Sequence, residues 1–182
     1  MDDGKGEKMN EAVELIGQII GIIAFIIAFF AYQAKTSKKL LIVQTLAIAC
    51  FCIHYLMIGA TTAFALNVIN VIRNIIYLNN DKKIFSYKWW PYLLSVIMVA
   101  VGAFTWQGWF SVLLIIGLAV NTVCMSMPSS QSIRKSLLFT CPPVLIYNII
   151  VWSWGGMVNE TLTIISSIIG IVRYARSEKE KK

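Results

Sequence analysis

The sequence predicts an all-α integral membrane protein with seven transmembrane helices, arranged as two parallel three-helix repeats joined by a linker helix. Of its 182 residues, 58% are hydrophobic and only 14% are charged, and the mean hydropathy is +0.71. Soluble domains carry about 25% charged residues. The uncharged stretches have the lengths of one or two membrane helices of about 20 residues each. Basic residues collect between alternate stretches. A soluble enzyme and a disordered chain are therefore excluded.

Charged residues mark the limits of the first three predicted helices. The 20 uncharged residues at 15–34 predict one helix. The next uncharged stretch, 40–72, has 33 residues and is long enough for a helical hairpin. Because a glycine followed by small residues favours a turn, Gly59 is expected to divide this hairpin. We therefore expect the second helix at 40–58 and the third at 63–78.

The second half of the chain predicts four more helices. The 45 uncharged residues from Trp89 to Ile133 predict two helices, divided at Trp106-Gln107-Gly108. A sixth helix is expected at 137–154, ending at Gly155-Gly156, and a seventh at 160–175. The predicted organisation is an external tail (1–12), the first repeat (13–79), the linker helix (89–105), the second repeat (109–176) and a cytoplasmic tail (177–182).

The distribution of basic residues predicts the orientation. With seven spans, 14 Lys and Arg residues lie on one side of the membrane or at helix ends facing it, whereas only Lys5 and Lys8 lie on the other side. Cytoplasmic loops are enriched in Lys and Arg. We therefore expect the amino terminus outside and the carboxyl terminus in the cytoplasm.

An internal repeat relates helices one to three to helices five to seven. The second helix of each triplet carries a polar aromatic or histidine pair, His54-Tyr55 in one and Tyr147-Asn148 in the other. The third helix of each triplet ends in two apolar residues and an arginine, Arg73 or Arg173. The two spacings differ, at 19 and 26 residues, so this pairing predicts a gap near the outer turn. Such a parallel repeat has its pseudo-axis along the membrane normal.

Three segments carry a resemblance to a known family. Residues 31–33 (Ala-Tyr-Gln), 54–60 and 70–73 resemble the YgjV family of bacterial inner-membrane proteins, and the likeness extends over 15–176. It implies a multi-pass protein of the bacterial cytoplasmic (inner) membrane and brings no substrate with it. The 3+1+3 plan is also similar to the SWEET, PQ-loop and PnuC transporters, which implies a solute transporter. The Pro-Gln signature of the PQ-loop proteins is absent from the first helix.

The best candidate binding residues are asparagines on the third helix. Asn67, Asn70 and Asn74 share one helical face, because they are spaced three and seven residues apart. Polar groups inside a span face a cavity or a partner helix. Carboxamides both donate and accept hydrogen bonds, which suits polar solutes. The SWEET resemblance implies a substrate role for Asn67 or Asn70, and the alternative is hydrogen bonding between helices.

Other polar and small residues form a second group of candidates. His54 and Tyr147 are expected to line the same cavity, with Asn148 beside them; the alternative for His54 is that it orders a neighbouring turn. Further polar candidates are Gln18, Gln33, Gln44 and Asn121. Arg73 and Arg173 are interpreted as cations reaching the cytoplasmic interface, and the alternative is a role in binding an anionic group. Gly17 and Gly21 predict close helix packing, either within the chain or between copies.

These residues predict a facilitator for a small, neutral, polar solute that works by alternating access. No Asp lies in a predicted span and Glu160 falls at a predicted helix end, so no carboxylate relay for a pump is expected. The motifs predict no enzyme activity, cofactor, metal site or nucleic-acid partner. Membrane lipids and the solute are the expected partners, and a homo-oligomer is left open. The alternative is a non-transporting membrane protein: a receptor, a lipid-interacting protein or an assembly partner.

Overall fold

The protein is an all-α bundle of seven helices. In a computed structural model, residues 3–32, 37–127 and 130–179 are described, and strands are absent from these ranges. In chain order the helices are α1 (Asp3–Tyr32), α2 (Ser37–Met57), α3 (Thr61–Leu78), α4 (Trp90–Phe104), α5 (Ser111–Cys124), α6 (Ser130–Ile150) and α7 (Trp154–Lys179). The predicted fold class is confirmed.

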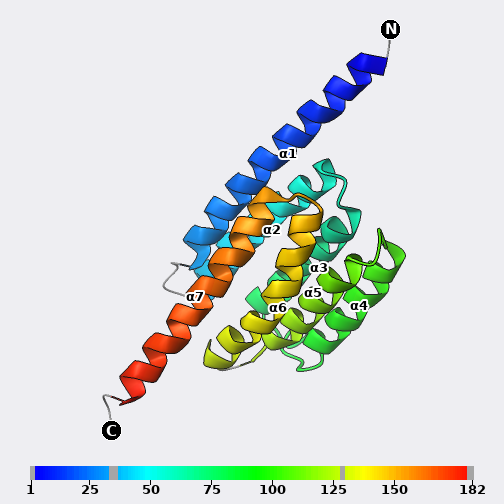
Figure 1. The fold of residues 1–182 in the computed structure, drawn as a ribbon. Helices are drawn as coiled ribbons and strands as arrows, with labels where there is room; N and C mark the ends of the chain where they lie inside the picture. The colour runs from blue at the N-terminus through cyan, green and yellow to red at the C-terminus, as the bar shows by residue number, and fades with distance from the viewer. Residues whose placement is uncertain (1–2, 33–36, 128–129, 180–182) are drawn as a thin grey trace.

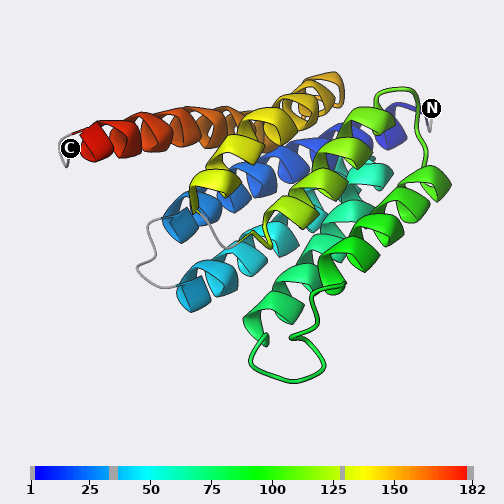
Figure 2. The ribbon, with the colours of Figure 1, turned by 90° about the horizontal axis from the view of Figure 1, so that it is seen from below.

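Six of the helices close into a ring. Helix α2 packs between α1 and α3, and α6 packs between α5 and α7. Contacts between α1 and α7 and between α3 and α5 join the two triplets. Helix α4 packs against α3 and α5 at the edge of the bundle (Figure 2). The contact of α7 with α1 corresponds to that of α3 with α5, as expected for two equivalent triplets joined by one additional helix.

Apolar side chains cover the outside of the bundle, and polar ones are buried within it. Phe104 and Phe139 are 91% and 80% exposed, whereas His54 and Asn148 have no exposed surface. Soluble proteins bury large apolar residues instead. Three stretches, Asn10–Ala31, Thr61–Leu78 and Trp154–Tyr174, are long and apolar enough to cross a membrane. This surface is suited to lipid, and the fold is that of an integral membrane protein.

The first and last helices extend beyond the bundle in opposite directions (Figure 1). Helix α1 begins at Asp3, so the described part of the predicted tail 1–12 is helical. Glutamate and lysine favour a helix, and acidic residues are stabilising near its amino terminus. Helix α6 begins at Ser130, seven residues earlier than predicted, because the polar residues before Leu137 continue its helix.

The break between α6 and α7 lies before the predicted Gly155-Gly156. The turn is at 151–153, where Trp152 has a φ of 53°, and both glycines lie in the first turn of α7. A Cβ atom at Gly155 would overlap the backbone of Gly21, and one at Gly156 would lie 2.5 Å from Asn148 Oδ1. The two glycines therefore allow close packing of α7 rather than a turn. For this reason the predicted break at Gly155-Gly156 is wrong.

The two turns of the repeats have the same backbone hydrogen bonds. Ala60 N donates to Tyr55 O (2.8 Å), and Ser153 N donates to Asn148 O (2.9 Å). Gly59, with a φ of 74°, takes the same place as Trp152. Each residue of the first turn is thus matched by the residue 93 positions later.

The spacing of 93 residues removes the predicted gap between the repeats. It holds across the turn, since α3 begins at Thr61 and α7 begins at Trp154. At this spacing Ser166 takes the place of Arg73, so the pairing of Arg73 with Arg173 is wrong. The two arginines also differ in environment, because Arg73 is buried and Arg173 is exposed.

Candidate functional site

A cavity of about 1390 Å³ lies inside the helix ring. Residues of both triplets line it, and many of them are related by the repeat. Nine such pairs, each 93 positions apart, are Phe25 and Leu118, Ala28 and Asn121, Leu41 and Arg134, Gln44 and Leu137, Ala47 and Thr140, Phe51 and Val144, Asn67 and Glu160, Asn70 and Thr163, and Arg73 and Ser166. The cavity therefore lies between equivalent faces of the two triplets.

Two of the three predicted asparagines line this cavity. Asn67 donates from Nδ2 to Ala63 O at 2.9 Å. Asn70 is 4% exposed, and its buried Oδ1 has no hydrogen-bond partner among the described residues. Asn74 is completely buried and absent from the cavity wall. Its side chain serves α3 itself, because its Oδ1 accepts hydrogen bonds from Arg73.

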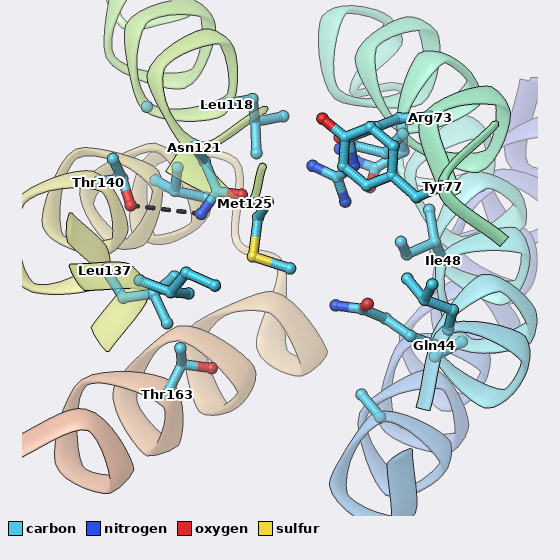
Figure 3. A pocket seen from close by; sticks show the side chains of 18 of the residues that line it. Gln44, Ile48, Arg73, Tyr77, Leu118, Asn121, Met125, Leu137, Thr140 and Thr163 are labelled. Carbon is cyan, nitrogen blue, oxygen red and sulfur yellow. Dashed lines mark hydrogen bonds between the residues drawn. The ribbon is translucent and has the colours of Figure 1, made fainter. Parts of the chain in front are cut away.

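Arg73 lies in the cavity wall rather than at the membrane interface. The side chain is 4% exposed, so its interpretation as an interfacial cation is wrong. Its Nε and Nη2 donate to Asn74 Oδ1 at 3.2 and 3.0 Å, and its Nη1 donates to Thr122 Oγ1 at 3.4 Å. Figure 3 shows Arg73 and Tyr77 on one side of the cavity, with Asn121 of α5 and Met125, just after α5, on the other. These hydrogen bonds hold the guanidinium in place within the ring.

Glu160 is the acidic residue of the cavity wall that the sequence analysis missed. Helix α7 begins at Trp154, so Glu160 lies six residues inside the helix and not at its end. Its carboxylate lines the cavity and accepts a hydrogen bond from Asn159 Nδ2 at 3.1 Å. It is the only acidic residue between Asp81 and Glu178. This isolation within an apolar region was a usable indication, but the misplaced helix start concealed it.

His54 is a packing residue beyond one end of the cavity. Its Nδ1 lies 2.7 Å from Gly17 O, and its Nε2 lies 2.7 Å from Ser153 Oγ. The ring thus joins α1, α2 and the turn before α7. His54 is absent from the cavity wall. Its placement corrects the expectation that it lines the cavity and matches the alternative, in which it orders a turn.

Tyr147 and Asn148 are also fully buried and absent from the cavity wall. Asn148 Oδ1 accepts a hydrogen bond from Tyr55 OH at 2.8 Å, which ties α6 to α2. The expectation that these two residues line the cavity is corrected too, because both are packed between helices. Tyr55 lines the cavity instead.

Two glutamines close the end of the bundle where the α2–α3 and α6–α7 turns lie. Gln18 Nε2 donates to Trp152 O (2.7 Å), and Trp154 N donates to Gln18 Oε1 (3.2 Å). Gln107 Nε2 donates to Gly59 O (2.8 Å), and Thr62 N donates to Gln107 Oε1 (3.1 Å). We call these two arrangements the glutamine clamps. In each, one side chain bridges the two ends of a turn in the other half of the ring.

The remaining candidates have different positions. Gln44 and Asn121 line the cavity. Gln33 lies outside the described residues, as do Lys35, Lys181 and Lys182 of the charge count. Gly17 and Gly21 pack within the chain, because Cβ atoms there would meet Met57 and the His54 ring.

This geometry defines a multi-pass membrane protein with a central cavity between two equivalent triplets. Residues 15–178 match a family model described as a bacterial inner membrane protein, Imp-YgjV. The chain therefore belongs to the YgjV family, which places it in the bacterial inner membrane. It is 25% identical over 167 residues to the inner membrane protein YgjV of Escherichia coli (strain K12), covering 90% of this chain and 87% of that protein. No solved structure matches the chain.

Proposed function

We propose that the protein is a facilitator that moves a small polar solute across the inner membrane by alternating access. The observation that supports this proposal is the cavity, whose walls are equivalent positions of the two triplets. Two equivalent halves around one binding site are the basis of rocking mechanisms in repeat-built transporters. Asn67 and Asn70 lie on the wall and would contact the solute.

The two ends of the cavity differ, as alternating access requires. One end is lined by Tyr55, Gly156 and Glu160 and lies next to the glutamine clamps. The other end reaches the exposed residues Asn80 and Lys88. With the amino terminus outside, the clamped end faces out and the open end faces the cytoplasm. The structure then corresponds to an inward-facing state.

The free energy of the hydrogen bonds in the clamps is of the size expected for a difference between two interconverting conformations. An intramolecular hydrogen bond contributes about 0.5–1.5 kcal/mol net. Four bonds in the two clamps therefore sum to a few kcal/mol, and conformations separated by a few kcal/mol interconvert with a detectable minor population. Opening the clamped end while the other end closes would make the site accessible from the opposite side of the membrane.

The facilitator mechanism is retained in the proposal on a revised argument. Glu160 lies in the cavity, so a carboxylate is present after all. However, the described cavity wall contains no second carboxylate and no histidine to relay a proton. Uptake is therefore expected to continue after a protonophore collapses the proton gradient.

Cysteine labelling tests the proposal. In a background lacking Cys50, Cys52, Cys124 and Cys141, single cysteines replace Asn67, Asn70 or Asn74, and membrane vesicles are treated with a membrane-impermeant thiol reagent. Asn67→Cys and Asn70→Cys are expected to be labelled, and Asn74→Cys is the matched dry control. If all three are unlabelled from both sides, the cavity is not water-accessible. A receptor, lipid-interacting or assembly role would then replace transport.

A further inference from the structure

We propose that the cavity binds a small organic ammonium ion, with its charged nitrogen at Glu160 and against the aromatic rings of the first triplet. This assignment rests on the proposed function, because it names the class of solute for the same site. It replaces the neutral solute expected from the sequence, because Glu160 lies in the cavity wall and not at a helix end.

Glu160 supplies the negative charge of the site. It is the only carboxylate among the described residues of the cavity wall. Its hydrogen-bonding neighbours are neutral: Asn159 Nδ2 donates to it at 3.1 Å, and the Cys141 thiol is the other. An ionisable side chain inside a membrane span is costly and marks a ligand or a partner. A cationic ligand supplies the opposite charge that these neighbours lack.

Three helices place side chains at the level of Glu160. Glu160 and Asn67 each lie six residues after the start of their helices, and Phe51 lies six residues before the end of α2. Because a helix rises 1.5 Å per residue, all three lie about 9 Å from the turns. In the ring, α7 stands opposite α3, and α1 and α2 join them on one side. Glu160 therefore faces Asn67 across the cavity, and Phe51 lies at the same level on the wall between them.

The aromatic rings of the cavity wall are confined to one half of it. Every aromatic residue of the described wall belongs to 25–92, and α5, α6 and α7 contribute none. The repeat makes the contrast direct, since Phe51 is paired with Val144. Tyr55, stacked on Phe51 with ring centroids 6.0 Å apart, is close enough to Glu160 to interact with it electrostatically. Aromatic faces attract cations, so a carboxylate beside these rings suits an ammonium ion.

Two buried polar atoms of the wall lack partners, and both are acceptors. Asn70 Oδ1 and Gln44 Oε1 make no hydrogen bond to a described residue. The donor groups without a partner, Asn74 Nδ2, Asn148 Nδ2 and Tyr147 OH, belong to residues outside the wall. A buried polar group without a hydrogen bond is costly. A ligand that brings N–H donors into the cavity therefore supplies what its wall lacks.

The basic residues of the wall lie farther from the turns than Glu160 does. Arg73 lies six residues beyond the α3 position equivalent to Glu160, which is about 9 Å along the helix. Arg134 Nη1 donates to Gly170 O at 3.4 Å, ten residues beyond Glu160 on α7. Lys88 is exposed at the open end. The electrostatic potential along the cavity therefore becomes more negative toward Glu160, which favours a cation at this level.

Thermal unfolding of the purified full-length protein in detergent tests the assignment. The probe is butylamine, which is protonated at neutral pH, compared with butanol, butyrate and potassium chloride at equal concentration. We expect butylamine to raise the melting temperature more than the others do, because it alone combines a positive charge, an apolar chain and N–H donors. No rise with butylamine, or an equal rise with any of the other three, would overturn the proposal.

Two pairs of variants then locate the site. Glu160→Gln should abolish the rise caused by butylamine, and Glu14→Gln, which changes an exposed carboxylate outside the cavity, should leave it intact. Phe51→Leu should reduce the rise, whereas Phe30→Leu, at a ring that is 62% exposed and outside the wall, should not. The second pair keeps the test available if Glu160→Gln does not fold. A rise that is unchanged in the cavity variants would overturn the proposal.

The ammonium class and the transport function can fail separately. If butylamine has no specific effect while Asn67→Cys and Asn70→Cys are labelled, transport stands and the ammonium class is wrong. If butylamine stabilises the protein through Glu160 while both cysteines stay unlabelled, the cavity binds an ammonium ion without transporting it.

Discussion

The imidazole of His54 joins three segments of the chain through two short hydrogen bonds. His54→Ala would leave Gly17 O and Ser153 Oγ without this partner in a buried site. An unsatisfied buried polar group costs about 1–3 kcal/mol. We expect a loss of stability of this size, measured by thermal or denaturant unfolding in detergent. Ile53→Ala, which changes an exposed neighbour on the same helix, is the control. Equal losses in the two variants would contradict a structural role for the ring.

The imidazole ring of His54 packs so closely against position 21 that it leaves room only for a glycine. A Cβ atom at position 21 would lie 2.7 Å from His54 Nδ1. Gly21→Ala should therefore push α1 away from α2, at a cost of about 1–3 kcal/mol for overpacking. The double variant with His54→Ala provides a specific test, because removal of the ring makes room for the methyl group. The loss of stability in the double variant should be smaller than the sum of the losses in the two single variants. Full additivity would show that position 21 does not contact the ring.

At the scale of elements, uncharged stretches predicted four helices closely. The observed limits of α2, α3 and α4, and the start of α5, lie within a few residues of the expected ones, because charges and simple turns bound them. The α6–α7 break was misplaced because glycines that permit close packing have the same sequence appearance as glycines that make a turn. Tryptophan at positive φ cannot be predicted from composition, since L-residues rarely adopt that conformation.

The candidate site could be predicted only in part from the sequence. Asn67 and Asn70 line the cavity, which is one of the two placements that helical spacing predicted, whereas Asn74 on the same face does not. Solute binding by Asn67 and Asn70 stays a prediction. Glu160 was missed because its helix was expected to start at that residue. Arg73 was misread because an arginine near a helix end normally reaches the interface. Its 4% exposure and its hydrogen bonds to Asn74 and Thr122 show that it is held inside.

The glutamine clamps make a prediction about the link between the two halves of the ring. Gln18→Ala and Gln107→Ala each remove two hydrogen bonds across this link, so the double variant should open the clamped end more often. Ala63→Cys, a fully buried position in the first turn of α3, is a suitable reporter. We expect its labelling by an external impermeant thiol reagent to increase in the double variant.

The matched control for the clamps is Gln44→Ala, which removes a glutamine from the cavity wall instead. It should leave the external labelling of Ala63→Cys unchanged. Single clamp variants should have intermediate and similar effects, because each clamp makes one bond to a carbonyl and one to an amide of its turn. An increase with Gln44→Ala alone would mean that the reporter senses general loosening of the bundle.

At the scale of the whole molecule, the repeat is a property of geometry more than of residue type. Positions 93 apart share turn hydrogen bonds and cavity exposure, yet they pair Asn67 with Glu160 and Arg73 with Ser166. Comparing identical residues, such as Arg73 and Arg173, therefore gave the wrong register. The two triplets therefore contribute different side chains to the cavity wall: the first supplies Arg73, and the second supplies Arg134 and Glu160.

The orientation of the molecule decides the direction in which this cavity opens. With the seven spans expected from the sequence, 14 of the 16 basic residues would lie on one side of the membrane or at helix ends facing it, and this side would include Lys88 and Arg134, which line the cavity. The positive-inside rule then predicts a cytoplasmic carboxyl terminus and a cavity open to the cytoplasm. A green fluorescent protein fused to the carboxyl terminus should fluoresce, and an alkaline phosphatase fused there should be inactive. Asn67→Cys should be labelled more strongly in inside-out than in right-side-out vesicles. Active phosphatase together with stronger labelling in right-side-out vesicles would reverse the orientation and make the described state outward-facing.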